Sequence, residues 1–165
     1  MSETVKPVKS GAEWAREVFA GDHFAFETTG IEVEETRLHY SRLSIPLAEK
    51  HRNAMNQVQG GVIFTLADFA FTLAAAYERP ITVTLTSNIS YMSRVKGQRL
   101  IAEANCLREG GHTCYYLIAV TDELGTKVAE AMITGYIMDR HPTESFPEES
   151  ADNPYREQYF FHTKK

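Results

Sequence analysis

Residues 60–80 read GGVIFTLADFAFTLAAAYERP, a long apolar segment around which the rest of the chain must pack. It predicts a helix from Gly60 to about Glu78, ended by the Arg-Pro pair that follows, because the residue before a proline disfavours the helical region. Apolar residues lie on nearly every side of this helix, and a helix without a polar face needs burial all round. The run is short for a membrane span and carries Asp68 near its middle, where a charge is costly. We therefore expect a buried helix in a soluble protein, covered partly by its own sheet and partly by a second subunit.

A sheet is predicted around this helix. Extended chain is expected over 31–47, and strands over 81–93, 98–108, 113–122 and 127–138, with a short amphipathic helix at 11–20. The first strand after the helix alternates, so Val83 and Leu85 are predicted on its apolar face and Thr84 on its polar face. Since one helix covers one face of a sheet, the fold class is α+β, with an antiparallel β-sheet wrapped around one long central helix.

The composition narrows the class of protein. The chain has 165 residues, the length of one compact domain, and a formal net charge of −5 with no cluster of Lys and Arg, so no nucleic-acid partner is expected. Cys106 and Cys114 flank a Gly-Gly pair, and a two-residue turn there would place them on opposite faces, as reduced thiols of a reducing compartment. The N-terminus has no apolar signal segment, and the histidines lack metal-ligand spacing. We expect a cytoplasmic protein without a metal or a membrane.

Asp68 is the first candidate for chemistry. It is the only ionisable residue between Gln59 and Glu78. An unpaired carboxylate among Phe and Ala side chains either destabilises the fold or has a raised pKa. Two interpretations are open. The helix exposes this point or pairs it with an arginine elsewhere, or the carboxylate faces a cleft and works as a nucleophile or general base.

The glycine pair that begins the helix is the second candidate. Without side chains, the N–H groups of Gly60 and Gly61 approach a ligand closely, and the helix dipole favours negative charge there, as an oxyanion hole requires. An ordinary loop-to-helix turn is the alternative. Asp68 lies roughly 12 Å further along the axis at 1.5 Å per residue. One carbonyl carbon cannot reach both groups of one helix, so the chemistry requires two antiparallel copies in a dimer with two shared sites.

These residues resemble a known family. The stretch HRNAMNQVQGG at 51–61, followed by Asp68, resembles the PaaI-like branch of the hotdog thioesterase superfamily, whose pattern is H-x-N-x-x-G-x-x-H-G-G-(x)₆-D/E. NISYMS at 88–93 resembles the segment after the family's helix. The resemblance spans about residues 23–138 and implies a hotdog fold, a homodimer or a dimer of dimers (homotetramer), and hydrolysis of acyl-CoA. It divides the chain into an N-terminal helical segment (1–22), a hotdog thioesterase domain (23–139) and a C-terminal tail (140–165).

The resemblance also implies roles for single residues. Asp68 would activate water or attack as the nucleophile, and the Gly60 N–H of the facing subunit would bind the thioester oxygen. Asn53 would position the water or the carbonyl. Gln59 stands where the family pattern has His; it can donate a hydrogen bond but cannot shuttle a proton. The substrate-binding positions are Gly61, Thr84, Tyr91, Met92, Arg94 and Lys96.

Several of these positions also have a simpler explanation. Thr84 fits an ordinary strand threonine equally well. Arg94 and Lys96 suit the phosphates of CoA, but they also fit solvated surface charge. Asn56 replaces a family glycine, and asparagine tolerates the left-handed backbone that a glycine would supply. His51 matches the pattern, although a histidine in a loop is more often structural than catalytic.

The leading hypothesis is an acyl-CoA thioesterase that hydrolyses a small or medium acyl-CoA, aromatic acyl groups included, to the free acid and CoA. No cofactor is expected, because CoA is part of the substrate. The replacement of His by Gln59 motivates an alternative, a non-catalytic acyl-CoA-binding or regulatory hotdog module. A hotdog dehydratase ranks last, since it would pair a histidine with the carboxylate.

Overall fold

The computed structural model describes residues 9–139. Its elements follow the predicted order, with strands on both sides of one long helix. They are helix α1 (Gly11–Val18), the single-turn π-helix η1 (Phe24–Thr28), strands β1 (Glu32–Arg37) and β2 (Tyr40–Pro46), the 3-10 helix η2 (Glu49–His51), helix α2 (Gly60–Ala76), and strands β3 (Thr82–Tyr91), β4 (Arg99–Glu109), β5 (Thr113–Asp122) and β6 (Lys127–Ile137). The predicted C-terminal tail lies outside the described residues.

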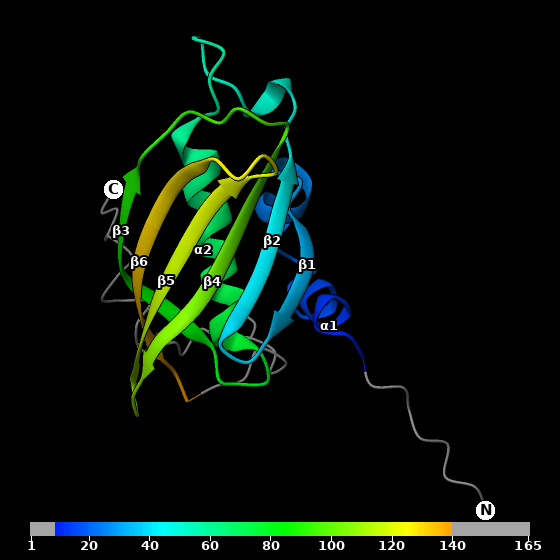
Figure 1. The fold of residues 1–165 in the computed structure, drawn as a ribbon. Helices are drawn as coiled ribbons and strands as arrows, with labels where there is room; N and C mark the ends of the chain where they lie inside the picture. The colour runs from blue at the N-terminus through cyan, green and yellow to red at the C-terminus, as the bar shows by residue number, and fades with distance from the viewer. Residues whose placement is uncertain (1–8, 140–165) are drawn as a thin grey trace, which may run out of the picture.

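One antiparallel sheet of six strands wraps around α2 in the order β1-β2-β4-β5-β6-β3 (Figure 1). This arrangement confirms the predicted α+β fold with a single central helix. Although β3 follows α2 directly, it pairs with β6 and not with β4. The strand therefore lies at one edge of the sheet, and β1 lies at the other.

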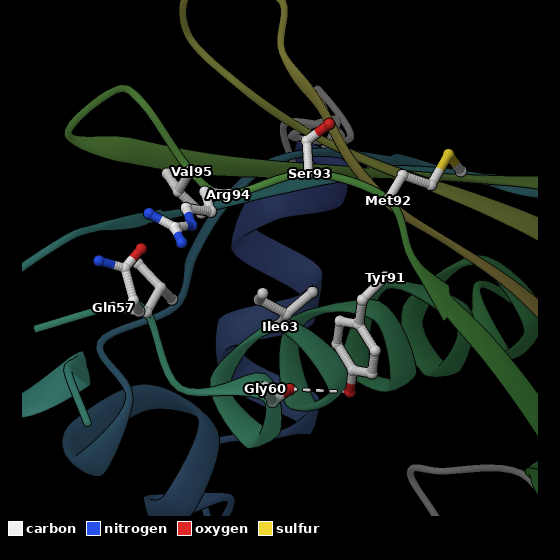
Figure 2. Close-up of a pocket in the computed structure, with 9 residues that line it drawn as sticks. Gln57, Gly60, Ile63, Tyr91, Met92, Ser93, Arg94 and Val95 are labelled. Carbon is white, nitrogen blue, oxygen red and sulfur yellow. Dashed lines mark hydrogen bonds between the residues drawn. The ribbon is translucent and has the colours of Figure 1, made fainter. Parts of the chain in front are cut away.

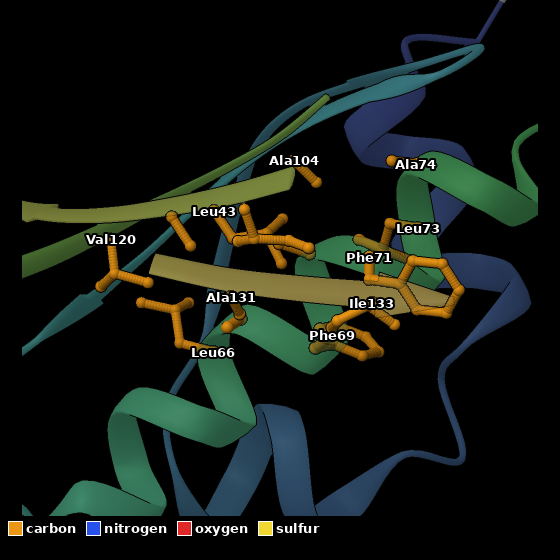
Figure 3. Close-up of a cluster of buried hydrophobic side chains, with 14 of the residues drawn as sticks. Leu43, Leu66, Phe69, Phe71, Leu73, Ala74, Ala104, Val120, Ala131 and Ile133 are labelled. Atoms are coloured by element: carbon orange, nitrogen blue, oxygen red, sulfur yellow. The ribbon is translucent and has the colours of Figure 1, made fainter. Parts of the chain in front are cut away.

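The core lies between α2 and the concave face of the sheet. Leu66, Phe71 and Leu73 of the helix are fully buried there, against strand residues such as Leu43 and Ile133 (Figure 3). Strand β5 shows the pattern that makes this possible, because its even-numbered residues from 114 to 122 are buried and its odd-numbered ones are not. The apolar side chains of α2 and the inward-facing side chains of the sheet thus form one core between them. Within residues 9–139, no helix is long and apolar enough to cross a membrane.

Helix α2 ends two residues earlier than predicted. Its last residue is Ala76, because Tyr77 already has an extended backbone (φ −61°, ψ 114°) and Glu78 has a positive φ of 53°. The chain has left the helical region before it reaches Pro80, as the proline effect requires.

The described part of the N-terminal segment, from residue 9 onward, packs on the same core. Ser10 and Glu13 form a capping box that starts α1, and Ala15 is fully buried. Phe19 meets Phe69 of α2 edge to face at 5.9 Å between ring centroids. Packing is therefore continuous across the boundary predicted at residue 22, which stays a prediction.

The predicted faces of β3 are wrong in its first half. Val83 and Leu85 are 41% and 54% exposed, whereas Thr82 is buried and Thr84 reaches the helix. A bulge between Thr84 and Thr86 causes this, because an extra residue in one strand exchanges the faces beyond it. Period-two alternation in the sequence cannot reveal such a residue.

The predicted separation of the two cysteines is also wrong. The Gly110 N–H donates to the Thr113 carbonyl at 2.8 Å, so the turn falls one residue later than expected, and a bulge follows Cys106. Cys106 therefore lies opposite Tyr116, on the same face as Cys114. Burial raises the pKa of both thiols, that of Cys114 to about 11, so both are protonated at neutral pH.

Candidate active site

Asp68 lies in the middle of α2, half-buried, with its carboxylate directed toward β3. The Thr84 hydroxyl donates to Asp68 Oδ1 at 3.2 Å. Burial raises the pKa of Asp68, the hydrogen bond from Thr84 lowers it, and the negative charge of Asp22 raises it further; the net direction is upward. The structure thus brings together the predicted pair of Asp68 and Thr84, and it excludes an arginine partner for Asp68 among the described residues.

A small cavity opens beside Asp68. It has a volume of about 220 Å³, and its lining combines two carboxylates with three aromatic rings. The lining includes Asp22, Phe24, Phe64, Asp68 and Phe69. A carboxylate with a raised pKa in such a setting is suited to accept a proton from water.

The sequence did not point to Asp22 or Phe24. Both lie in the segment around η1, where the Asp22 carboxylate accepts a hydrogen bond from the Ala25 N–H at 2.9 Å and starts the turn. An aspartate before a helical turn is a capping signal. Nothing in its spacing relates it to Asp68, which is distant in sequence and comes close only because η1 packs on α2.

The start of α2 uses one of its two glycine N–H groups internally. The Gln59 side-chain oxygen accepts from the Gly61 N–H and caps the helix. No described residue accepts a hydrogen bond from the Gly60 N–H. Gly60 therefore supplies the donor that remains available at this helix end, and Gln59 serves as a cap.

A second cavity, of about 380 Å³, adjoins Gly60 (Figure 2). It brings together four of the predicted residues, Gly60, Tyr91, Met92 and Arg94. The Tyr91 hydroxyl donates to the Gly60 carbonyl at 3.1 Å, which ties β3 to the start of the helix. Lys96 does not line this cavity; its backbone N–H donates to the Asp122 carboxylate at 2.9 Å.

A third cavity, of about 310 Å³, also borders the start of the helix. Its lining includes Phe24, Lys50, His51, Gln59 and Gly61. None of the three cavities is lined by both Gly60 and Asp68. Within one chain the two predicted catalytic groups thus face different spaces.

His51 has a structural role in this chain. It is buried, its Nδ1 accepts from the Ala48 N–H at 2.9 Å, and its Nε2 lies 2.9 Å from the Thr29 carbonyl, to which it donates. Burial lowers the pKa of the imidazole, so the neutral ring joins the loop before α2 to the end of η1.

Asn53 organises its own loop. Its side-chain oxygen accepts from the N–H groups of Met55 and Gln57, at 2.9 and 3.1 Å. The structure does not bring Asn53 to Asp68 of the same chain. Asn56 in this loop has a φ of 55°, the left-handed backbone that asparagine tolerates in place of the family's glycine.

The comparisons with known proteins agree with this fold and site. The model of the thioesterase superfamily matches residues 55–129. A curated relative from Archaeoglobus fulgidus, described as "Putative esterase", is 32% identical over 123 residues, which cover 74% of this chain and 77% of the relative. The structure of the PaaI protein from the phenylacetic acid degradation operon of E. coli shares the fold, with a TM-score of 0.73 and 18% identity over 79% of this chain and 96% of that chain.

A structure from Streptococcus mutans, solved bound to acetyl CoA, has a TM-score of 0.64 and 25% identity over 67% of this chain and 90% of that chain. The matched residues 55–129 contain α2, both glycines at its start and Asp68. The similarity therefore includes the helix on which the site is built. The chain belongs to the thioesterase superfamily, an enzyme family with the hotdog fold.

Proposed function

We propose that this chain is an acyl-CoA thioesterase that hydrolyses a small or medium acyl-CoA to the free acid and CoA. The observation that carries the proposal is the half-buried Asp68 carboxylate, with a raised pKa and one oxygen held by Thr84, beside a cavity of about 220 Å³ lined in part by aromatic rings. The acetyl CoA bound to the Streptococcus mutans relative supports CoA as the carrier of the acyl group.

Asp68 would act on water or directly on the thioester. As a general base it takes one proton from a water molecule while the water oxygen bonds to the carbonyl carbon. When the tetrahedral intermediate collapses, the carbon–sulfur bond breaks and CoA leaves as the thiolate, which then takes up a proton. As a nucleophile, the carboxylate would bond to the carbonyl carbon and displace CoA as the thiolate, and water would then hydrolyse the resulting anhydride to the free acid and the Asp68 carboxylate. Either route requires the ionised form of Asp68 and no cofactor beyond the CoA of the substrate.

The Gly60 N–H would stabilise the negative charge on the thioester oxygen. It lies at the positive end of the α2 dipole and donates to no described residue. Gln59 cannot take over proton transfer, since its side-chain oxygen caps the helix and an amide does not gain or lose a proton at neutral pH. Asp68 would therefore perform the proton chemistry alone.

The complete site would contain two copies of the chain. Gly60 and Asp68 lie roughly 12 Å apart along the axis of α2, and they face different cavities. Strand β3 is an edge strand that exposes Val83 and Leu85, and an exposed apolar edge favours pairing with a second strand. A dimer joined there would place the helices side by side.

Arg94, exposed at the Gly60 cavity, would pair with a CoA phosphate.

A non-catalytic acyl-CoA-binding module is the second candidate. The observation that favours it is the Gln59 side chain, which stands at the family's histidine position and is engaged in capping. Such a module would bind acyl-CoA with the same cavities and release no thiol.

Thiol release from a panel of acyl-CoAs separates the two functions. We expect wild type to release CoA from at least one short acyl-CoA, and Asp68→Asn to lose about 10²–10⁴-fold in kcat. Glu130→Gln is the matched control, because it neutralises an exposed carboxylate on β6, and it should keep wild-type activity. If wild type binds acyl-CoA but releases no thiol above background, the enzyme proposal fails and the binding module stands.

A further inference from the structure

Phe24 lines two cavities along α2. The cavity beside Asp68 and the cavity beside Gln59 and Gly61 share only two lining residues, Phe24 and Thr65. Thr65 belongs to the helix and forms the common floor, whereas Phe24 comes from η1. Phe24 and Thr65 are thus the residues at which the two spaces adjoin.

The turn that carries this ring is firmly held. Asp22 caps its start, and the Thr29 hydroxyl donates to the Ala25 carbonyl at 2.6 Å at its end. Phe26, two residues after Phe24, packs edge to face on Phe69 of α2 at 5.4 Å between ring centroids. The backbone under Phe24 is therefore held on the helix, beside the two cavities that this residue lines.

Phe24 itself contributes little to the core. Its side chain is 59% exposed, and it belongs to none of the aromatic pairs found among the described residues. Its neighbours Phe26 and Ala25, by contrast, pack into the core or against it. A ring that does not fill the core, and that borders the cavity of Asp68, is placed to contact a ligand.

The volume of the cavity indicates the size of that ligand. A cavity of about 150 Å³ lined by apolar side chains holds benzene, and the cavity beside Asp68 measures about 220 Å³. It would take a single ring or about six carbon atoms before the chain meets Phe24. The space beyond the ring is larger, at about 310 Å³.

We infer that Phe24 is a specificity-determining residue that ends the acyl cavity and restricts the enzyme to short or single-ring acyl groups. This inference rests on the proposed acyl-CoA hydrolysis and assigns its selectivity to a residue outside the predicted motif. Removing the ring would join the two cavities into one channel along α2.

The test is the dependence of kcat/KM on acyl length, from acetyl- to dodecanoyl-CoA, for wild type, Phe24→Ala and Phe24→Tyr. We expect wild type to lose activity beyond about six carbons. In Phe24→Ala the ratio of dodecanoyl to hexanoyl activity should rise by more than about tenfold, since each newly buried methylene is worth about fourfold. Phe24→Tyr keeps the ring and should keep the wild-type profile.

Phe24→Trp tests the same role independently, because it should shorten the range of acyl lengths that Phe24→Ala extends. The larger ring should reduce activity on hexanoyl-CoA by more than about tenfold while acetyl-CoA is still hydrolysed. Circular dichroism and thermal unfolding establish that each variant is folded.

Two results would overturn the inference. One is an unchanged length profile in folded Phe24→Ala or Phe24→Trp. The other is a uniform change at every acyl length, which would place Phe24 on the path of the CoA moiety. A wild type that hydrolyses no acyl-CoA refutes the proposed function itself, whereas an active wild type with an unaltered profile in the variants refutes only the role of Phe24.

Discussion

Asp68 has two polar neighbours that act on its pKa in opposite directions. Burial raises the pKa, Asp22 raises it further by charge, and the hydrogen bond from Thr84 lowers it. Since the proposed reaction needs the ionised carboxylate, activity should be present above this pKa and be lost as the pH falls through it.

The charge of Asp22 can be removed with its cap retained. In Asp22→Asn the amide oxygen still accepts from the Ala25 N–H, but the negative charge is gone. The pKa of Asp68 should fall, so the acidic limb of the kcat/KM profile should move to lower pH. Glu27→Gln, which removes an exposed charge from the same turn, should leave the limb in place. If the acidic limb of the kcat/KM profile lies at the same pH in wild type and Asp22→Asn, Asp22 has no electrostatic effect on the reaction.

Removing the hydroxyl of Thr84 should have the opposite sign. Thr84→Val deletes the hydrogen bond to Asp68 Oδ1 that lowers the pKa of this carboxyl. The acidic limb of kcat/KM should therefore move to higher pH, with a loss of about tenfold or less at high pH, where Asp68 is ionised in both proteins. A pH profile that moves downward, or does not move, would contradict this role for Thr84.

Asp122 stabilises the fold at the end of β5. It is 2% exposed and accepts from the N–H groups of Lys96, Gly97, Leu124 and Thr126. Burial alone would raise its pKa, but these donors lower it to about 2. Because the folded pKa lies below the unfolded value, the stabilisation is present above about pH 4 and is lost as the pH falls toward 2.

Asp122→Asn tests this contribution. At pH 7 the variant should be less stable than wild type by about 2.5 kcal/mol, the value of the pKa difference. Urea unfolding at pH 7 and at pH 3 measures the gap between the two proteins, which should narrow at pH 3. If the difference in stability between the two proteins is the same at pH 7 and at pH 3, the charge of Asp122 does not stabilise the fold.

At the scale of elements, the sequence predicted every helix and strand that carries the site except the short turns η1 and η2. The apolar run of α2 and the proline after it were sufficient for the helix, and alternation was sufficient for the strands. The faces of β3 were not predictable, because the bulge between Thr84 and Thr86 depends on pairing with β6. Asp22 and Phe24 could not be predicted as site residues for a similar reason, since only the packing of η1 on α2 brings them to Asp68.

The contact of β6 with β3 and α2 depends on Gly135. A Cβ there would lie 2.5 Å from Thr82 Cγ2 and 2.6 Å from Phe71 Cζ. Gly135→Ala should therefore lower the free energy of unfolding by about 1–3 kcal/mol. Gly111→Ala, where a Cβ would meet no atom within 4 Å, is the control and should have a much smaller effect. Chemical denaturation compares the two, and equal stability of both variants would contradict the close packing at Gly135.

At the scale of the whole molecule, the proposed site depends on a second copy of the chain. If β3 forms the interface, Leu85→Lys should place a charge in it and shift the protein toward monomers in sedimentation experiments. Thiol release should fall together with the dimer fraction. Leu107→Lys is the matched control, because Leu107 is equally exposed but lies in the interior strand β4. A Leu85→Lys protein that remains dimeric would exclude β3 as the interface.

The most direct test of the shared site combines two inactive variants in one dimer. Gly60→Pro removes the proposed oxyanion donor, and proline suits this position because it is the first helical residue and Gln59 before it is extended (φ −66°, ψ 131°). Gly60→Ala keeps the N–H and controls for the added carbon atoms. Asp68→Asn removes the base.

The two variants would be co-expressed with different tags, and the mixed dimer purified through both. If each site takes Gly60 from one chain and Asp68 from the other, one of its two sites is intact, and thiol release should recover to about half of the wild-type rate. A folded mixed dimer that stays as inactive as its two parents would contradict the shared site.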